Sequence, residues 1–274
     1  MFGPDDEIRK KCISMQALLS FNNLTVTVVE EGKEKKIVYG ASFDVQPHSI
    51  CALVGGSGSG KTTTALAAMR LLSSGVEVTG GQIVFDGQEI FKLTEERVRS
   101  LRGKGIGMVF QEPLYAFNPI FSIAEQIDEV LLVHTPLPKD KRQKKILELL
   151  DTVGIQEPKR VAGNYPHQLS GGMRQRAMIA QALAGNPKLM IADEPTSNLD
   201  VTLQAKIMDL FRKLKKDFGL SILLISHDLG MVRHMAEDIV VMDRGRVVEK
   251  GKTPDVISRP QHEYTQQLMD AFGD

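Results

Sequence analysis

One short stretch of glycine and serine constrains the fold of this chain more than any other feature. Residues 55–62 read GGSGSGKT and match the pattern G-x-x-x-x-G-K-[ST]. The apolar run ICALVG leads into them, and the helix-forming run KTTTALAAMRLL begins at Lys61. A merely flexible turn would not need a strand before it and a helix after it. The stretch therefore predicts an α/β fold in which a buried strand, a loop and a helix N-terminus form a phosphate site.

The residue types of this phosphate loop suit a nucleoside triphosphate. Glycines let backbone N–H groups wrap the β-phosphate, the Lys61 ammonium reaches the β- and γ-oxygens, and the Thr62 hydroxyl can bind Mg²⁺. We therefore expect ATP and Mg²⁺ as cofactors. The loop residues expected to bind the nucleotide are Gly55, Gly56, Ser57, Gly58, Ser59, Gly60, Lys61, Thr62 and Thr63.

Two adjacent carboxylates end the apolar run LMIADE, residues 189–194. Alone, such a run could be any junction between a strand and a loop. Beside a phosphate loop, Asp193 is expected to hold Mg²⁺ through water, and Glu194 to polarise the attacking water. Adjacent residues at a strand end point to different faces, which suits two separate roles.

Single polar residues follow two further apolar runs. Gln111 comes after GIGMVF, and His227 comes after SILLIS. A lone Gln or His in such a place is usually structural. If the runs are strands of one parallel sheet, however, both side chains lie at the edge where the phosphate loop presents the γ-phosphate. We therefore expect catalytic roles for both, and Mg²⁺ ligation by Gln111 in addition to Thr62 and Asp193.

A second possible phosphate element lies at LSGGMRQR, far from the first along the chain. Ser170, Gly171 and Gly172 precede a helix predicted from Met173 to Ala184, and a helix N-terminus attracts anions. The alternative is a helix cap without a ligand. The residues alone do not explain why one chain would need two phosphate elements.

The remaining pattern predicts hairpins and a helical region. LLSFNNLTVTVVEE and KKIVYGASFDV alternate as an antiparallel pair, and Asp86-Gly87 suits the turn of a second hairpin. Apolar residues recur at helical spacing from Ile123 onward. Two last strands are expected on either side of Arg244-Gly245.

Composition excludes several classes of protein. Lys+Arg and Asp+Glu both total 34, so the net charge of zero gives no reason to expect a nucleic acid partner. No apolar run reaches the roughly 20 residues that cross a bilayer, and the start of the chain does not resemble a signal peptide. The two cysteines, at 12 and 51, suggest neither a disulfide framework nor a metal site, which indicates a reducing compartment.

The motifs together resemble the nucleotide-binding subunit of ATP-binding-cassette (ABC) transporters. The resemblance runs from about Leu19 and rests on GGSGSGKT, Gln111, LSGGM, LMIADE, SNLD and His227, in that order. Met173 and Asn198 depart from the family patterns LSGGQ and SALD, changes that we expect to be tolerated. The resemblance implies a P-loop NTPase (RecA-like) core with an antiparallel β subdomain and an inserted α-helical subdomain.

The resemblance also implies a division of the chain. Residues 1–18 would be an N-terminal extension and 19–250 the ABC ATPase domain, with the helical subdomain at about 112–178. The C-terminal tail would be 251–274.

The resemblance explains the two phosphate elements. In this family two subunits face head to tail, so that Ser170, Gly171 and Gly172 of one would close over the γ-phosphate held by the other. The expected partners are a second ABC ATPase, a different chain by our expectation, and two transmembrane permease subunits, with an extracellular solute-binding protein acting indirectly. The expected location is peripheral, at the cytoplasmic face of the cell membrane.

Three stretches resemble the oligopeptide, dipeptide and nickel importer group: FQEPLYAFNPIFSIAEQI, YPHQLSGGMRQR and RPQHEYTQQLM. The last is similar to that group's HPYT box, with Glu263 in place of proline. Peptide members usually continue well past this box and often carry a cysteine cluster. The end of this chain at Asp274 therefore slightly favours a nickel or metal-chelate cargo over peptides.

Two expectations concern apolar contacts. Leu114, Tyr115 and Phe117 are candidates for an exposed groove that receives a permease helix, or else they pack beneath their loop. The family often stacks adenine on an aromatic residue that here falls at Val28, and Tyr39, the nearest aromatic residue, falls elsewhere. We therefore expect weak stacking and modest base selectivity.

Two rival functions are weaker. Soluble ABC proteins of DNA repair or translation typically carry two cassettes or a long coiled-coil insertion, whereas this chain has one motif set. A P-loop kinase would not explain LSGGM, SNLD and His227 together.

Overall fold

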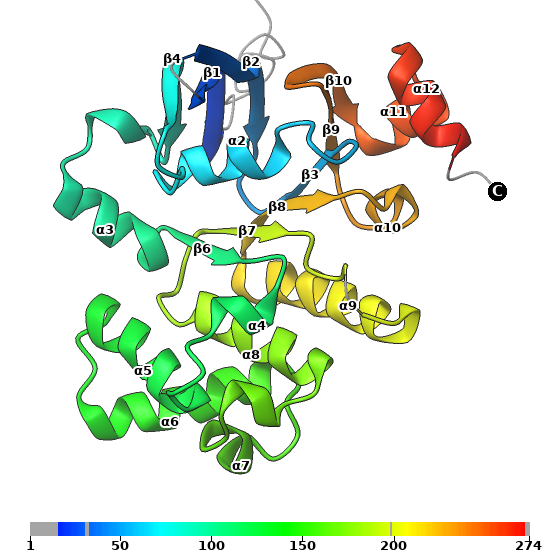
Figure 1. The fold of residues 1–274 in the computed structure, drawn as a ribbon. Coiled ribbons are helices and arrows are strands. Elements are labelled where there is room, and N and C mark those ends of the chain that lie inside the picture. The colour runs from blue at the N-terminus through cyan, green and yellow to red at the C-terminus, as the bar shows by residue number, and fades with distance from the viewer. Residues whose placement is uncertain (1–15, 31–32, 198, 272–274) are drawn as a thin grey trace, which may run out of the picture.

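The computed structural model describes residues 16–30, 33–197 and 199–271. Figure 1 shows two β-sheets at the upper end of the molecule and a helical body at the lower end. Asn198 and most of the expected N-terminal extension lie outside the described residues. Leu18 belongs to the folded part, because its side chain is buried and its N–H bonds the carbonyl of Val45 at 2.9 Å.

The first sheet is antiparallel and has the strand order β2-β1-β4-β5. Its strands are β1 (Leu19–Glu30), β2 (Lys33–Val45), β4 (Val76–Phe85) and β5 (Gln88–Glu89). Both predicted pairings are present, β1 with β2 and β4 with β5. Asp86 and Gly87 take positive φ values of 50° and 77°, as expected for a two-residue hairpin turn.

The second sheet has six strands in the order β10-β9-β3-β8-β7-β6. They are β3 (Ile50–Val54), β6 (Ile106–Val109), β7 (Leu189–Asp193), β8 (Ser221–Ser226), β9 (Asp238–Asp243) and β10 (Arg246–Lys252). Strands β6, β7, β8, β3 and β9 run parallel, and β10 returns antiparallel after the expected turn at Arg244-Gly245. The carboxyl ends of the parallel strands therefore meet at one edge.

This sheet separates two hydrophobic cores. Along β3, Ile50, Ala52 and Val54 belong to the core shared with the helical body, whereas Cys51 and Leu53 belong to the core under the antiparallel sheet. The alternation follows from the two-residue period of a strand. Both faces are covered, which explains why the central strands read as continuous apolar runs.

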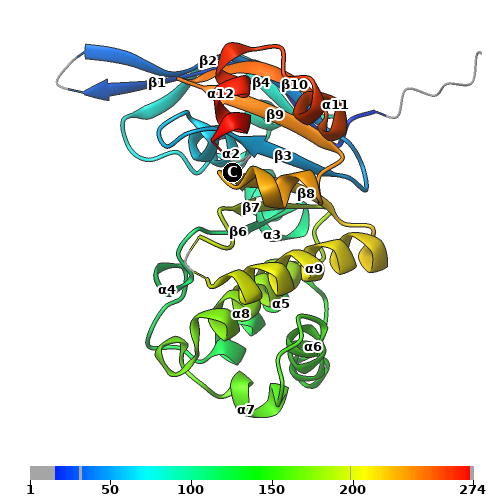
Figure 2. The same ribbon diagram turned by 90° about the vertical axis from the view of Figure 1, so that its right-hand side faces the viewer.

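The helical region lies between β6 and β7 in sequence and forms the lower body in Figures 1 and 2. Its elements are α4 (Pro113–Ala116), α5 (Ile123–His134), α6 (Lys139–Thr152), α7 (Pro158–Ala162), η2 (Pro166–Gln168) and α8 (Gly171–Leu183). Helix α5 begins where expected, with a complete capping box between Ser122 and Glu125.

The other helices connect the strands. They are α2 (Lys61–Ala68), η1 (Ile90–Lys92), α3 (Glu95–Lys104), α9 (Val201–Phe218), α10 (Leu229–Arg233), α11 (Thr253–Ser258) and α12 (Glu263–Asp270). Among the described residues, no helix is long and apolar enough to cross a bilayer.

Two details bear on the sequence-based expectations. Helix α8 begins at Gly171, two residues before Met173, because the Ser170 hydroxyl accepts a hydrogen bond from the Met173 N–H and caps the helix. Of the two alternatives for the 114–117 segment, packing holds for Phe117, which is 3% exposed and lies in the core of the helical body. Leu114 and Tyr115 are exposed, at 49% and 82%.

Candidate functional site

The phosphate loop joins the end of β3 to the start of α2, as the motif predicts. The backbone conformation or the close packing at two positions of the loop requires glycine. Gly55 has φ 151°, and a Cβ there would lie 2.1 Å from the carbonyl oxygen of Met242. Gly60 has φ 95° and forms the N-cap of α2. A larger residue at either position would distort the loop.

A cavity of about 400 Å³ opens in front of the loop. It lies at the carboxyl edge of the parallel sheet and is lined by Ile37, Ser57, Gly58, Ser59, Gly60, Lys61, Thr62, Thr63, Gln111, Glu194 and His227. Residues from five separate parts of the sequence thus meet at one site. The structure brings together the phosphate loop and the three residues expected to be catalytic.

The Lys61 ammonium is held by the loop itself. Its Nζ donates to the carbonyl oxygens of Gly55 at 2.9 Å and Gly56 at 2.8 Å. Burial lowers the pKa of Lys61, and the nearby carboxylates of Glu194 and Asp193 act in the opposite direction. Lys61 is 6% exposed and lines the cavity, where phosphate oxygens could replace the carbonyls as partners of its ammonium.

Thr62 and Asp193 place two side-chain oxygens next to each other. The Thr62 hydroxyl donates to Oδ1 of Asp193 at 3.2 Å. Burial raises the pKa of Asp193, an effect that Glu194 reinforces and that the Thr62 hydrogen bond and the Lys61 charge oppose. A hydroxyl and a carboxylate side by side fit Mg²⁺, which prefers oxygen and is usually shared between one or two carboxylates and substrate phosphates. Within the described ranges no three His, Cys, Asp or Glu side chains lie close enough together to hold a metal ion.

Glu194 directly follows β7 and lies between the other two polar side chains. Its Oε2 accepts a hydrogen bond from Nε2 of Gln111 at 3.0 Å and lies 3.4 Å from Nδ1 of His227. The backbone of Glu194 has φ 42°, uncommon for a residue with a side chain, and its N–H bonds the carbonyl of Ile225 at 3.0 Å. Such local strain is typical of functional positions.

The second expected phosphate element lies elsewhere. Ser170, Gly171 and Gly172 form the N-terminus of α8 in the helical body and are absent from the lining of the 400 Å³ cavity. Gly172 is packed closely, because a Cβ there would lie 3.2 Å from the Leu203 side chain. Gly55, Gly56 and Asp193 also do not line the cavity, although they bond to residues that do.

The sequence analysis missed Ile37, which contributes an apolar side chain to the cavity wall. Val28 pairs with Lys35 between β1 and β2, and Tyr39 lies under the guanidinium of Arg246, 4.8 Å from the ring centre. No aromatic residue belongs to the described lining. Ile37 belongs to no recognisable sequence motif. Only the pairing of β1 with β2 could have indicated that its side chain lies at the cavity.

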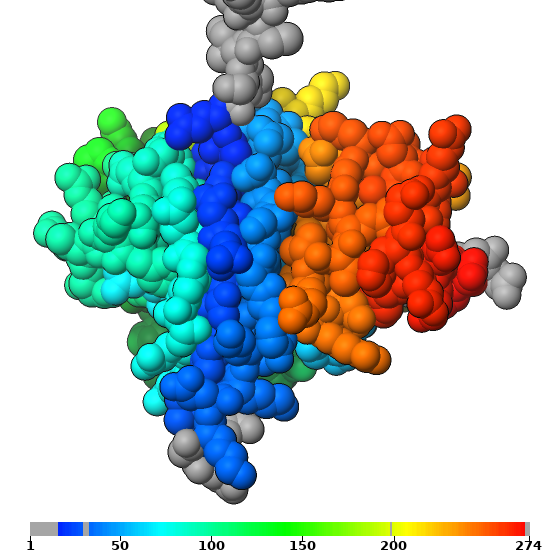
Figure 3. All heavy atoms as spheres, turned by 90° about the horizontal axis from the view of Figure 1, so that it is seen from above, coloured from blue at the N-terminus to red at the C-terminus, as the bar shows by residue number. Residues whose placement is uncertain are grey.

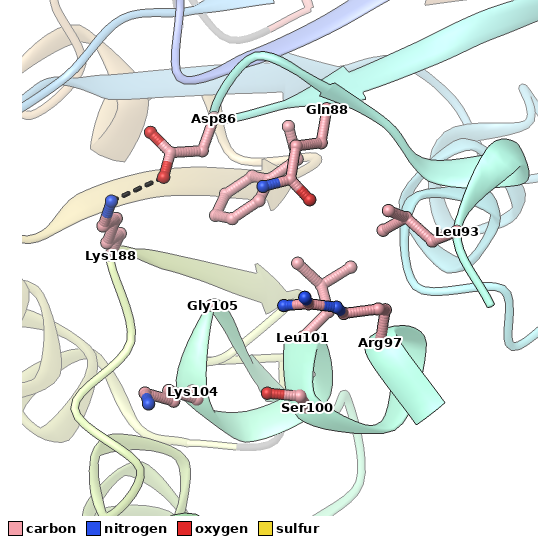
Figure 4. Close-up of a pocket in the computed structure, with 10 residues that line it drawn as sticks. Asp86, Gln88, Leu93, Arg97, Ser100, Leu101, Lys104, Gly105 and Lys188 are labelled. Atoms are coloured by element: carbon pink, nitrogen blue, oxygen red, sulfur yellow. Dashed lines mark hydrogen bonds and ion pairs between the residues drawn. The ribbon is translucent and has the colours of Figure 1, made fainter. Parts of the chain in front are cut away.

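A second hollow, of about 290 Å³, lies between the antiparallel sheet and α3. Figure 4 shows Asp86 and Lys188 facing each other at its edge, where their side chains form an ion pair at 2.5 Å. Arg97 and Lys104 also line it. None of the residues expected to bind nucleotide or act in catalysis lines this hollow, so the site described above is the candidate functional site.

These features of the fold and the site define an ATP-binding cassette. The cassette consists of a parallel sheet covered on both faces, an antiparallel sheet and an inserted helical body. At the edge of the parallel sheet lie the phosphate loop, the paired carboxylates and the polar residues that follow the strands. The chain belongs to the ABC transporter family, whose profile matches residues 38–197. The expected family and fold class are therefore confirmed, and the chain is an ABC-type ATPase.

Curated relatives are transport ATP-binding proteins. The peptidoglycan transport ATP-binding protein YejF of Agrobacterium fabrum is 46% identical over 93% of this chain, although the chain spans only 47% of that relative's length. The oligopeptide transport ATP-binding protein OppD of Lactococcus lactis is 42% identical, over 92% of this chain and 75% of its own length. These relatives agree with the expected oligopeptide importer group.

Solved structures of ABC cassettes share the fold. A dimeric, post-hydrolysis structure of the ATP-binding cassette MJ0796 bound to ADP and Pi superposes with a TM-score of 0.77 and 29% identity, covering 86% of this chain and 98% of that one. CbiO1 of Clostridium perfringens, part of the transporter complex CbiONQ, gives 0.76 and 27%, covering 89% and 91%.

Proposed function

We propose that this chain is the ATP-hydrolysing subunit that energises a membrane importer of peptides. The observation that carries the proposal is the position of Glu194, held between Gln111 and His227 at the cavity in front of the phosphate loop. A carboxylate in this position can accept the proton of a water molecule that attacks the γ-phosphate.

The other residues have complementary roles in this proposal. N–H groups of the phosphate loop and the Lys61 ammonium bind the phosphates. Thr62, Asp193 and Gln111 would hold Mg²⁺, which neutralises charge on the phosphates when bound. His227 orients Glu194 through the contact of 3.4 Å and adds a polar group beside the γ-phosphate.

Ser170, Gly171 and Gly172 are proposed to act on a nucleotide held by a second ABC subunit. Their absence from the cavity of their own chain supports this arrangement. The MJ0796 cassette forms a dimer in its structure, which also supports it. The partner ATPase would bind head to tail, and our expectation of a different chain stays a prediction.

The proposed cargo is a peptide, because the relative OppD is an oligopeptide transport ATP-binding protein. This name favours peptides over a nickel or metal-chelate cargo. Two permease subunits are the proposed membrane partners, with an extracellular solute-binding protein acting indirectly. The location would be peripheral, at the cytoplasmic face of the membrane, and the exposed Leu114 and Tyr115 are proposed to contact a permease.

The same proposal keeps the division of the chain. It consists of an extension of residues 1–18, an ATPase domain of 19–250 and a tail of 251–274, and the described elements differ at both bounds, because Leu18 is buried in the folded part and β10 ends at Lys252. A role in DNA repair or translation is not favoured, because the curated relatives described above are transport proteins.

The decisive experiment measures ATP binding and hydrolysis by three variants of the purified chain. Glu194→Gln should bind ATP and lose at least about 100-fold of its turnover, since a general base contributes 10²–10⁴. Lys61→Ala should lose both activities. The control Glu129→Gln, on the exposed face of α5, should match the wild type. If Glu194→Gln hydrolyses ATP as fast as the wild type, Glu194 is not the general base.

The partners are tested by capture. Tagged Glu194→Gln chain is recovered from its native membranes in ATP, and the co-purified proteins are identified by mass spectrometry. Two multi-span proteins and a second ATPase would support the importer. Recovery of ribosomal or DNA-repair proteins alone would contradict it.

A further inference from the structure

The C-terminal tail contacts the phosphate loop directly. The N–H of Gly56 donates a hydrogen bond of 2.7 Å to the hydroxyl oxygen of Tyr264, at the start of α12. The two residues are 208 positions apart in sequence. The HPYT-like box, to which the proposed catalytic cycle assigns no role, thus supplies a side chain that contacts the backbone of the phosphate loop.

Gly56 is held through both of its polar backbone groups. While its N–H bonds Tyr264, its carbonyl oxygen accepts hydrogen bonds from Nζ of Lys61 at 2.8 Å and from the N–H of Ser59 at 3.3 Å. Because glycine is free to rotate, these bonds fix the orientation of the peptide groups on either side of it. The Lys61 ammonium must exchange its bond to Gly56 for one to a phosphate when ATP binds. The Tyr264 hydroxyl can keep its bond to the Gly56 N–H.

The tail itself is firmly seated on the last strand. Both carboxylate oxygens of Glu249 accept backbone bonds, from Gln261 at 2.9 Å and His262 at 3.0 Å. The His262 side chain then caps α12 by accepting from the Tyr264 N–H at 3.1 Å. These bonds determine where the Tyr264 ring lies.

The final hairpin holds the same loop from another side. The N–H of Gly245, in the turn between β9 and β10, donates to the carbonyl of Ser59 at 3.0 Å. Figures 2 and 3 show β9, β10, α11 and α12 as one continuous region beside the N-terminal strands. The last part of the chain therefore contacts the phosphate loop at two points, through Gly245 and through Tyr264.

We propose that Tyr264 is a positioning residue for the ATP site: its hydroxyl fixes the Gly56 peptide, so that the C-terminal tail sets the affinity of the phosphate loop for ATP. The proposal rests on the proposed function, because it requires ATP to bind at this loop. Tyr264 does not touch the reacting atoms. Its loss therefore acts on nucleotide binding rather than on the chemical step.

The test is Tyr264→Phe in the full chain, which removes only the hydroxyl. The loss of one hydrogen bond predicts a rise of about 3- to 10-fold in the Kd and KM for ATP, with kcat within about twofold of the wild type. The control is Tyr39→Phe, which removes a hydroxyl from the neighbouring antiparallel sheet and should leave these constants unchanged. A purely structural role would lower Tm without this change in KM.

Amide exchange reports the contact independently of ATP. The Gly56 amide should exchange slowly in the wild type and faster in Tyr264→Phe, with no change in Tyr39→Phe. If Tyr264→Phe does not fold, Glu249→Gln provides a second variant, because it weakens the seating of the tail and should raise the Kd in the same direction.

The outcomes separate the two proposals. Wild-type affinity for ATP in Tyr264→Phe, with a wild type that does bind ATP, would overturn only the role of Tyr264. Failure of the wild type to bind ATP would overturn the proposed function, and this role with it. Rapid exchange of Gly56 in the wild type would show that the hydrogen bond does not constrain the loop.

Discussion

The side-chain amide of Gln111 donates a 3.0 Å hydrogen bond to Oε2 of Glu194, and Nδ1 of His227 lies 3.4 Å from the same oxygen. The three residues follow β6, β7 and β8, which are neighbours in the sheet. Two side chains from adjacent strands thus determine the orientation of one carboxylate.

Replacing either neighbour should lower turnover more than binding. We expect His227→Ala to reduce kcat about 100-fold and Gln111→Ala to reduce it less, because misplacement of a catalytic group by about 1 Å costs that much. The Kd for ATP should change by less than about threefold, since neither residue belongs to the phosphate loop. Steady-state hydrolysis and equilibrium binding measure the two quantities.

The matched control is His234→Ala, an exposed histidine beyond α10 that does not line the cavity. A kcat of His227→Ala equal to that of this control would contradict the orienting role.

The meeting of Gln111, Glu194 and His227 could be predicted because parallel strands place their carboxyl ends at one edge. The positive φ of Glu194 could not, since it depends on the bond from its N–H to Ile225. Phe117 resembles its neighbours Leu114 and Tyr115 in sequence, and only the packing of α4 on α8 distinguishes its buried position. The contact between Tyr264 and Gly56 joins distant parts of the chain that no local pattern relates.

Removal of Mg²⁺ should abolish hydrolysis, and Asp193→Asn should raise the Mg²⁺ concentration that hydrolysis requires. The Asp193 carboxylate beside the Thr62 hydroxyl would be the charged ligand of this pair. We expect the Mg²⁺ concentration for half-maximal turnover to rise about 10- to 100-fold, the range found when groups that support a metal are lost. Titration of Mg²⁺ at saturating ATP measures this, and an unchanged midpoint would exclude Asp193 from metal binding.

Phe117 and Tyr115 offer a direct comparison of buried and exposed aromatic residues. Phe117→Ala should lower the free energy of unfolding by about 3–5 kcal/mol, because it leaves a cavity in the core of the helical body. Tyr115→Ala should change it by less than about 0.5 kcal/mol, since the side chain is 82% exposed. Urea unfolding of both variants provides the measurement, and equal losses would contradict the assigned burial.

We expect Tyr115 instead to contribute to the stimulation of ATP hydrolysis by the permease. In the assembled transporter, Tyr115→Ala should weaken permease-stimulated hydrolysis and leave basal hydrolysis of the isolated chain unchanged. An equal fall in both rates would count against a docking role.

The nucleotide site should discriminate weakly between bases. Ile37 is the apolar residue of the described cavity lining, which contains no aromatic ring on which a base could stack. An aliphatic contact is largely indifferent to the base, so we expect kcat/KM for ATP and GTP to agree within about tenfold. Strict preference for ATP would show that another group recognises adenine.

The seating of the tail should depend on pH through Glu249. Burial alone would raise the pKa of this carboxyl, but the hydrogen bonds from Gln261 and His262, with the charge of His262, bring the net pKa below its ordinary value. A carboxyl whose pKa is lower in the folded state stabilises that state above its unfolded pKa of about 4.3, and this contribution disappears as the pH falls through the folded value.

Glu249→Gln should therefore lower Tm most near pH 7, and the difference from the wild type should shrink as the pH falls below the ordinary carboxyl pKa of about 4.3, because protonation then favours the unfolded state of the wild type. Thermal unfolding of both proteins between pH 7 and pH 3.5 measures the difference. The control Glu129→Gln should show little difference at any pH, because Glu129 is exposed on α5 and belongs to none of the tail contacts. A Glu249→Gln difference that stays constant across this range would mean that the carboxylate charge does not hold the tail in place.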